Sequence, residues 1–364
     1  MEQQVKRVPY GVSDFANVIE QNQYYVDKTM FIPELEKQPS NLFFIRPRRF
    51  GKSIFLSMLY SYYDCSQSDD FQKLFGNLWI GQHPTPLQGK YQVLFLDFSQ
   101  ITGNIDKLED KFNSYLSINL DAFVRQYAVY YQAEKEEILA QEDFEEKLEL
   151  IFKAAKSHKY PLYLIVDEYD NFTNVILNER GEKVYHAITH ADGFYRDVFK
   201  KFKGNFERIF MMGVSPVTLD DVTSGFNIGW NISIKPEFDE MLGFSTTDVI
   251  NMFTYYKEHG CIPADSDIDA IVNDMKPWYD NYCFAKQALK KNTRMFNCDM
   301  VLYYLRNYMD YGHAPEEMID PNTRTDYGKM KKLLQFDKLD GERKGIIRKI
   351  AEEGQIVAQL YESF

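Results

Sequence analysis

Hydrophobic residues gather early in the chain into a short run, which is followed by a polar loop and a helical pattern. The segment NLFFIRP (residues 41–47) is apolar and partly aromatic up to Ile45, as is typical of a buried strand. In KSIFLSMLYSYYD (residues 52–64) the apolar residues recur with helical spacing, at Ile54, Phe55, Met58, Leu59 and Tyr62. The pattern therefore predicts strand, loop and helix in immediate succession.

Further apolar runs alternate with helical patterns up to about residue 236. Strands are predicted in YQVLFLDFS (91–99), YPLYLIVDEYDNF (160–172) and FERIFMMGVSPVTLDDV (206–222). Helices are predicted at Asn104–Tyr131, at Glu134–Ser157 and in ADGFYRDVFKKFK (191–203). Alternating strands and helices predict an α/β fold, in which a parallel sheet is covered by helices on both faces.

Beyond about Glu237 the pattern becomes mainly helical. Ser245 and Asp248 have the spacing of a capping box at the start of one predicted helix, and Gly260 stands where that helix would end. DSDIDAIVNDMKPWYDNYCF (265–284) and CDMVLYYLRNYM (298–309) also read as helices. We therefore expect three parts: a core at residues 1–236, a helical lid at 237–319 and a connecting segment at 320–364.

Composition and charge narrow the classes of function. The formal net charge of −12 argues against a general nucleic-acid-binding surface, because phosphate backbones need a positive face. The four cysteines are scattered, which favours reduced thiols over a disulfide framework or a zinc site; they are Cys65, Cys261, Cys283 and Cys298. No apolar run has the length of a membrane span, and the N-terminus lacks the core of a signal peptide. We expect a cytoplasmic protein that does not contact a membrane.

The loop after the first predicted strand ends like a phosphate-binding loop but begins differently. The P-loop rule asks for Gly, four free positions and then Gly-Lys-Ser/Thr. Gly51, Lys52 and Ser53 satisfy its end, whereas Arg46 takes the place of the first glycine. A basic surface turn is the alternative. The strand before and the helix after favour nucleotide binding, with Lys52 at the β- and γ-phosphates and Ser53 as a Mg²⁺ ligand.

Acidic residues at the end of a later predicted strand complete a site for NTP hydrolysis. Asp167 suits the metal shell and Glu168 suits the activation of water, although two acids can also simply end a strand at the surface. Ser215, at the end of the next strand, is the first candidate for sensing the γ-phosphate, and Thr218 is the second. A serine before proline is also an ordinary turn residue.

Two other groups of polar residues are weaker candidates for a metal site. His186 and His190 are four positions apart and would share one face of a helix, but the sequence offers no evident third ligand. An ordinary helix surface is the better explanation of this pair. Asp220 and Asp221 are best explained as a capped turn after a strand.

Five segments together resemble the AAA-ATPase-like family, whose members usually carry a C-terminal PD-(D/E)XK nuclease-like domain. They are GVSDFANVIEQNQYYVDKTMFI, RPRRFGKS, LIVDEYDNF, MMGVSPVTLDDVTSGFN and WYDNYCF, and the likeness runs from about residue 8 to the end. In this family RPRRFGKS is the usual form of the loop, so Arg46 is a variant that the family shares. The resemblance implies a P-loop ATPase core of the additional-strand (AAA-like) type that binds Mg·ATP.

The resemblance implies roles where residues match. Lys52 and Ser53 would hold phosphates and Mg²⁺, Asp167 would hold the metal shell and Glu168 would act on the attacking water, so that Lys52 and Glu168 are the catalytic candidates. YYVDKT (24–29) would form a turn beside the nucleotide. The full set expected to bind the nucleotide is Arg46, Pro47, Arg48, Arg49, Phe50, Gly51, Lys52, Ser53, Ile54 and Ser215. The arginines could neutralise phosphates or grip a partner acid.

The C-terminal part departs from the family pattern. The chain ends at AQLYESF without an Asp…Glu-x-Lys constellation, so we expect no nuclease activity from these residues. The leading hypothesis is an ATPase coupled to a nuclease-like effector, which would also supply any contact with nucleic acid; a homo-oligomer is compatible with it. One alternative is a nucleotide-gated switch that binds ATP or ADP and scarcely hydrolyses it. Another is an interaction scaffold that binds no nucleotide.

Overall fold

A parallel β-sheet forms the centre of the molecule. The computed structural model describes residues 4–101, 107–171, 173, 176, 193–214, 229–280, 282–291 and 294–323. Within these residues the strands are β1 (Asn41–Ile45), β2 (Gln92–Asp97), β3 (Leu162–Asp167), β4 (Arg208–Gly213) and β5 (Trp230–Asn231). Their order across the sheet is β2-β3-β4-β1-β5, and every neighbouring pair is parallel. The predicted mixed α/β fold with a parallel sheet is confirmed.

The strands are apolar because both faces of the sheet are covered. Every residue of β3 is buried, and β4 is buried from Ile209 onward. Across the β1–β4 pair Phe43 lies opposite Met211, and across the β3–β4 pair Leu164 lies opposite Ile209. Continuous apolar runs of this kind are what a parallel sheet with helices on both sides requires.

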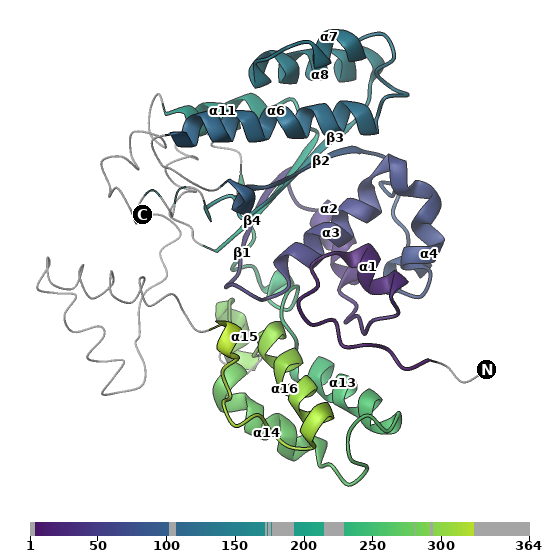
Figure 1. Ribbon diagram of the computed structural model, residues 1–364, viewed down its shortest axis with the longest axis vertical. Helices are drawn as coiled ribbons and strands as arrows, with labels where there is room; N and C mark the ends of the chain where they lie inside the picture. The colour runs from purple at the N-terminus through teal and green to yellow at the C-terminus, as the bar shows by residue number, and fades with distance from the viewer. Residues whose placement is uncertain are drawn as a thin grey trace, which may run out of the picture.

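Helices cover the sheet on both faces (Figure 1). On one side lie α6 (Leu108–Gln126), α7 (Lys135–Leu139), α8 (Phe144–His158) and α11 (Phe194–Phe202). On the other lie α1 (Phe15–Glu20), α2 (Ile32–Glu36), α3 (Lys52–Tyr63) and α4 (Phe71–Phe75), with α5 (Trp79–Gln82) packed against α4. Short 3₁₀ turns link several of these elements, among them Thr29–Phe31, Cys65–Asp70, Phe98–Gln100 and Pro236–Phe238.

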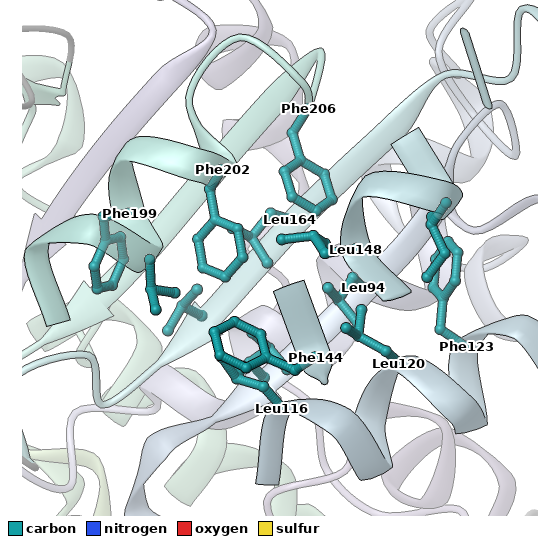
Figure 2. Packing of buried hydrophobic residues seen from close by; sticks show 14 of the residues in the cluster. Leu94, Leu116, Leu120, Phe123, Phe144, Leu148, Leu164, Phe199, Phe202 and Phe206 are labelled. Atoms are coloured by element: carbon teal, nitrogen blue, oxygen red, sulfur yellow. The ribbon is translucent and has the colours of Figure 1, made fainter. Parts of the chain in front are cut away.

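Alternate residues of each strand enter different apolar clusters, one on each face. Phe43 belongs to the cluster under α6, α8 and α11, whereas its neighbours Leu42 and Phe44 belong to the cluster around α3 and α4. Figure 2 shows the first cluster, in which Leu94 and Leu164 from the strands meet phenylalanine and leucine side chains from the helices. The period-2 pattern of the strands thus builds both cores at once.

A mainly helical region follows the sheet and packs beside the carboxyl end of β1 and the start of α3 (Figure 1). It contains α13 (Thr246–Glu258), α14 (Ile268–Tyr279), α15 (Lys286–Lys291) and α16 (Cys298–Tyr311), which we call the helical unit; Pro321–Thr323 adds a final turn. Ser245 and Asp248 form the predicted capping box at the start of α13. The helical unit has an apolar cluster of its own, which includes Phe253 and Tyr304. The boundaries at residues 236 and 319 stay a prediction.

Several elements of the structure differ from the sequence prediction. The helix expected over Glu134–Ser157 is two helices, because the Asp143 side chain accepts hydrogen bonds from the N–H groups of Glu145 (2.7 Å) and Glu146 (3.2 Å) and starts α8 there. The α6 helix is shorter than the predicted Asn104–Tyr131. Strand β5 was not predicted. Among the described residues no helix is long and apolar enough to cross a membrane.

Candidate functional site

The loop between β1 and α3 has the backbone shape that its glycine allows. Gly51 has φ 83° and ψ 23° and stands directly before the first helical residue of α3. This left-handed conformation suits glycine, which has no Cβ to clash with its own backbone. Arg49 also has a positive φ of 66°. The loop therefore turns sharply into the N-terminus of a helix whose first N–H groups have no partner within the helix.

The Lys52 side chain lies folded over its own loop. Its ammonium group donates hydrogen bonds to the main-chain oxygens of Arg46 (3.2 Å) and Pro47 (2.9 Å), and the residue is only 6% exposed. Burial lowers the pKa of Lys52, and the charges of Asp167 and Glu168 oppose that effect. An ammonium has three donors. Two of them close the loop, and the third can serve another acceptor.

Ser53 and Asp167 join the loop to the end of the acidic strand. The Ser53 hydroxyl donates a hydrogen bond of 2.5 Å to Asp167 Oδ2, across 114 positions of sequence. Burial raises the pKa of Asp167 to about 6, and this hydrogen bond works in the opposite direction. At neutral pH the carboxyl is therefore largely ionised. Asp97 lies opposite Asp167 on β2, and its charge contributes to the raised pKa.

Glu168 follows β3 in an unusual backbone conformation. Its φ is 50°, a region that residues with a Cβ seldom occupy. Its N–H donates to Asp167 Oδ1 (2.9 Å), and its carbonyl oxygen accepts from the N–H of Asn171 (2.9 Å). Burial raises the pKa of Glu168, while Arg48 and Lys52 oppose the rise. The strained turn points to a position that the surrounding structure holds in place.

The end of β4 is tied closely to the segment that follows Glu168. Both carboxylate oxygens of Asp170 accept from the N–H of Val214 at 3.1 Å, and Asp170 is 1% exposed. A Cβ on Gly213 would lie 2.5 Å from both Asp170 Oδ1 and Tyr169 Cε1, so only glycine permits this approach. Ser215, which follows Val214, lies outside the described residues. Thr218, Asp220, Asp221, His186 and His190 also lie outside them.

A cavity of about 710 Å³ opens over the loop. Its lining includes seven of the residues predicted to bind the nucleotide (Arg48, Arg49, Phe50, Gly51, Lys52, Ser53 and Ile54), together with Glu168. Asp167 lies behind Ser53 and is not among the lining residues, and neither are Arg46 and Pro47. The structure thus brings the loop and the acidic turn to one cavity.

Two other parts of the chain complete the cavity wall. Tyr24, Tyr25 and Lys28 come from the YYVDKT segment, which the family resemblance expects beside the nucleotide. Cys298 and Asp299 come from the first turn of α16. This contribution of the helical unit could not be found from sequence, because nothing in the local pattern of α16 marks it as part of a site.

The three arginines of the loop have different surroundings. Arg48 is exposed, lines the cavity and has no hydrogen bond from its side chain to any described residue. Arg49 pairs with Asp299 and donates to the main-chain oxygen of Asn322 (2.8 Å). Arg46 is 1% exposed and donates to main-chain oxygens instead of facing the cavity. Among the three, Arg48 is the side chain placed to meet a ligand.

Comparison with known proteins places the chain in a family. A sequence model of the family described as "Predicted AAA-ATPase" matches residues 9–223, more than half of the chain. The chain belongs to this AAA-ATPase-like family. Among curated proteins it is 26% identical over 293 residues to the "Uncharacterized protein in vnfD 5'region" of Azotobacter chroococcum mcd 1, a match that covers 78% of this chain and 50% of that protein. The chain thus spans about half the length of this relative.

Membership of the AAA-ATPase-like family supports nucleotide binding and an ATPase-like function. The donors at the site fit a magnesium ion, because the Ser53 hydroxyl and the Asp167 carboxylate are the hard oxygen ligands that this ion prefers. In the described part of the chain, this site included, no group of three or more His, Cys, Asp or Glu side chains is arranged to hold a metal. The four cysteines, all described, are free thiols.

Proposed function

We propose that the protein binds Mg·ATP in the cavity over the loop and hydrolyses it to ADP and inorganic phosphate. The observation that carries the proposal is the contact between Ser53 and Asp167, since it joins the helix after the loop to the end of the acidic strand. Lys52 and Glu168 face the same cavity from those two elements. Family membership supports the same function.

The phosphates are bound at the start of α3. This helix has twelve residues, and its first N–H groups and its dipole favour an anion at the N-terminus. Lys52 contributes the donor that its loop contacts leave over, and Arg48 contributes a second cation from the cavity wall. Ser53 and Asp167 would hold Mg²⁺, which when bound neutralises part of the negative charge on the β- and γ-phosphates.

Glu168 acts as the general base. A water molecule attacks the γ-phosphorus, its proton passes to the Glu168 carboxylate, and the bond to the β-phosphate oxygen breaks to leave ADP. The raised pKa of Glu168 makes its carboxylate a better proton acceptor than that of an exposed glutamate. The hydrogen bonds at its N–H and carbonyl group hold the side chain at the cavity wall.

The strand order supports the additional-strand type of P-loop fold. Strand β4 lies between β1, which precedes the loop, and β3, which carries the acids. The helical unit then serves as the lid, because Cys298, Asp299 and Leu302 of α16 line the cavity and Asp299 pairs with Arg49 of the loop. Ser215, after β4, remains the proposed γ-phosphate sensor. We further propose a nuclease-like effector as the partner of the ATPase.

Steady-state phosphate release from ATP tests the proposal. The wild-type protein should release phosphate from ATP in the presence of Mg²⁺, and this release should stop when excess EDTA removes the ion. Binding of Mg·ATP without release would instead identify a nucleotide-gated switch. A protein that neither binds Mg·ATP nor releases phosphate would contradict the proposal. That result would favour the interaction scaffold instead.

A further inference from the structure

The loop is fastened to the region that follows the sheet by a buried arginine. The Arg46 guanidinium donates to the main-chain oxygens of Ser233 (2.8 Å) and Phe238 (2.9 Å). It also lies between two aromatic rings, 4.0 Å from the ring centre of Phe44 and 3.8 Å from that of Phe284. A planar guanidinium can stack on ring faces while its N–H groups donate in the plane, a geometry that the compact ammonium of lysine does not reproduce.

A second loop residue contacts the same surface. Phe50 is fully buried, and its ring meets Tyr282 edge-on at 4.7 Å and Phe284 at 5.6 Å between ring centres. Its main-chain oxygen accepts a hydrogen bond from the N–H of Gly243 (3.2 Å). A Cβ on Gly243 would come within 3.0 Å of the Phe50 ring, so the two segments pack in close contact. Arg46 and Phe50 therefore both contact the ring of Phe284, one from each end of the loop, and Phe50 also contacts Tyr282.

The main chain at Phe284 is itself held in place by the carboxylate of Asp239. Asp239 Oδ1 accepts from the N–H groups of Phe284 (3.0 Å) and Ala285 (2.7 Å), and Asp239 is 3% exposed. The negative charge of Asp239 favours the charged form of Arg46, whose pKa burial lowers to about 9. Arg46 is thus still protonated at neutral pH. Tyr282 and Phe284 belong to the WYDNYCF motif, so the structure brings that motif and RPRRFGKS together.

We propose that Arg46 is a positioning residue for the phosphate-binding loop and that Tyr282 and Phe284 are the surface on which the loop is held. The inference rests on the proposed function. Arg46 connects Lys52 with the region beyond the sheet. Its main-chain oxygen accepts a hydrogen bond from the Lys52 ammonium, and its guanidinium donates to main-chain oxygens of that region. Nucleotide affinity then depends on contact between the loop and this surface.

Calorimetric titration with Mg·ADP tests the inference. ADP has no γ-phosphate, so the proposed reaction does not consume it during the titration. Arg46→Gly restores the first glycine of the P-loop rule. If that position simply tolerates any residue, this variant binds as well as the wild type. If Arg46 positions the loop, affinity falls at least about tenfold, which corresponds to ~1.4 kcal/mol. Millimolar guanidinium should restore part of the affinity by occupying the vacated site, which a loss of general stability would not allow.

A pair of aromatic substitutions separates positioning from destabilisation. Phe284→Leu removes a ring that contacts the loop, whereas Phe253→Leu removes a buried ring of the helical unit that contacts Tyr304. The inference predicts weaker Mg·ADP binding only in Phe284→Leu, with folding of both checked by thermal unfolding. Equal affinities in both variants, or equal losses, would overturn it. If the wild type itself does not bind Mg·ADP, the proposed function fails instead.

Discussion

The Ser53 hydroxyl donates a hydrogen bond of 2.5 Å to the Asp167 carboxylate, and this contact joins two motifs that lie far apart in the sequence. It fixes the first turn of α3 against the end of β3. Lys52 and Glu168, the neighbours of the two bonded residues, are thereby brought to one cavity. A hydroxyl and a carboxylate in contact at the edge of a parallel sheet, beside a helix N-terminus, form the arrangement that Mg·phosphate binding needs.

Replacing Glu168 with glutamine tests its role as the base. The amide keeps the shape of the side chain but cannot accept a proton, so Mg·ATP binding should persist while phosphate release falls by about 10² or more. The measurement is steady-state phosphate release beside an ATP titration. Glu258→Gln, at the exposed end of α13, is the matched control and should behave as the wild type. Turnover at the wild-type rate in Glu168→Gln would place the base elsewhere.

The burial of Asp167 predicts a pH-dependent effect on stability. Its folded pKa of about 6 lies above the ordinary value of 3.8, so ionisation of the carboxyl costs free energy in the folded state. That cost is fully present above about pH 6 and disappears as the pH falls toward the ordinary value. At about 1.4 kcal/mol per pKa unit, the upper limit of the cost is ~3 kcal/mol.

Asp167→Asn should therefore raise the free energy of unfolding at neutral pH, and the gain should shrink as the pH falls from about 7.5 to about 5. Urea unfolding of both proteins across this range measures the difference. The same variant should bind ATP with weaker dependence on Mg²⁺, because an amide is a poorer ligand for this ion than a carboxylate. A gain in stability that does not change with pH would contradict the assigned cause.

Gly213 is predicted to be essential for the approach of β4 to the acidic turn. Alanine at this position would put a Cβ 2.5 Å from the Asp170 carboxylate and the Tyr169 ring. Both groups are buried, so we expect a loss of roughly 1–3 kcal/mol of stability together with reduced ATPase activity. Gly204→Ala is the control, because nothing lies within 4 Å of its Cβ and only its positive φ opposes the change. Equal effects of the two substitutions in thermal unfolding would refute the packing argument.

Local patterns predicted the elements that carry the chemistry. The strand at Asn41–Ile45 and the helix at Lys52–Tyr63 follow from the period of their apolar residues, and Gly51 marks the turn between them. The carboxyl ends of parallel strands share one edge of the sheet, so Asp167 could be expected near the loop once β1 and β3 were recognised. Alternation of strand and helix also predicted the parallel sheet.

Contacts over long sequence separations could not be predicted in this way. Arg46 meets Ser233 and Phe238 across 187 and 192 positions, and no periodicity within RPRRFGKS indicates them. The P-loop motif therefore predicts Arg46 among the nucleotide-binding residues, although its guanidinium is buried against main-chain oxygens. The break between α7 and α8 depends on a single cap at Asp143, whose local effect the longer helical pattern concealed. Ser215 stays a prediction, because it lies outside the described residues.

The central claim is that the cavity over the loop binds ATP through Lys52. Titration calorimetry with Mg·ATP on the wild type and on Lys52→Ala tests it most directly, with Lys37→Ala, an exposed lysine, as the control. Lys52→Ala removes the ammonium that closes the loop and that we propose as a phosphate ligand. We expect the affinity of Lys52→Ala for Mg·ATP to fall by at least about tenfold (~1.4 kcal/mol), while its thermal unfolding stays cooperative and Lys37→Ala binds as the wild type. Unchanged affinity in a folded Lys52→Ala protein would contradict the assignment of the site.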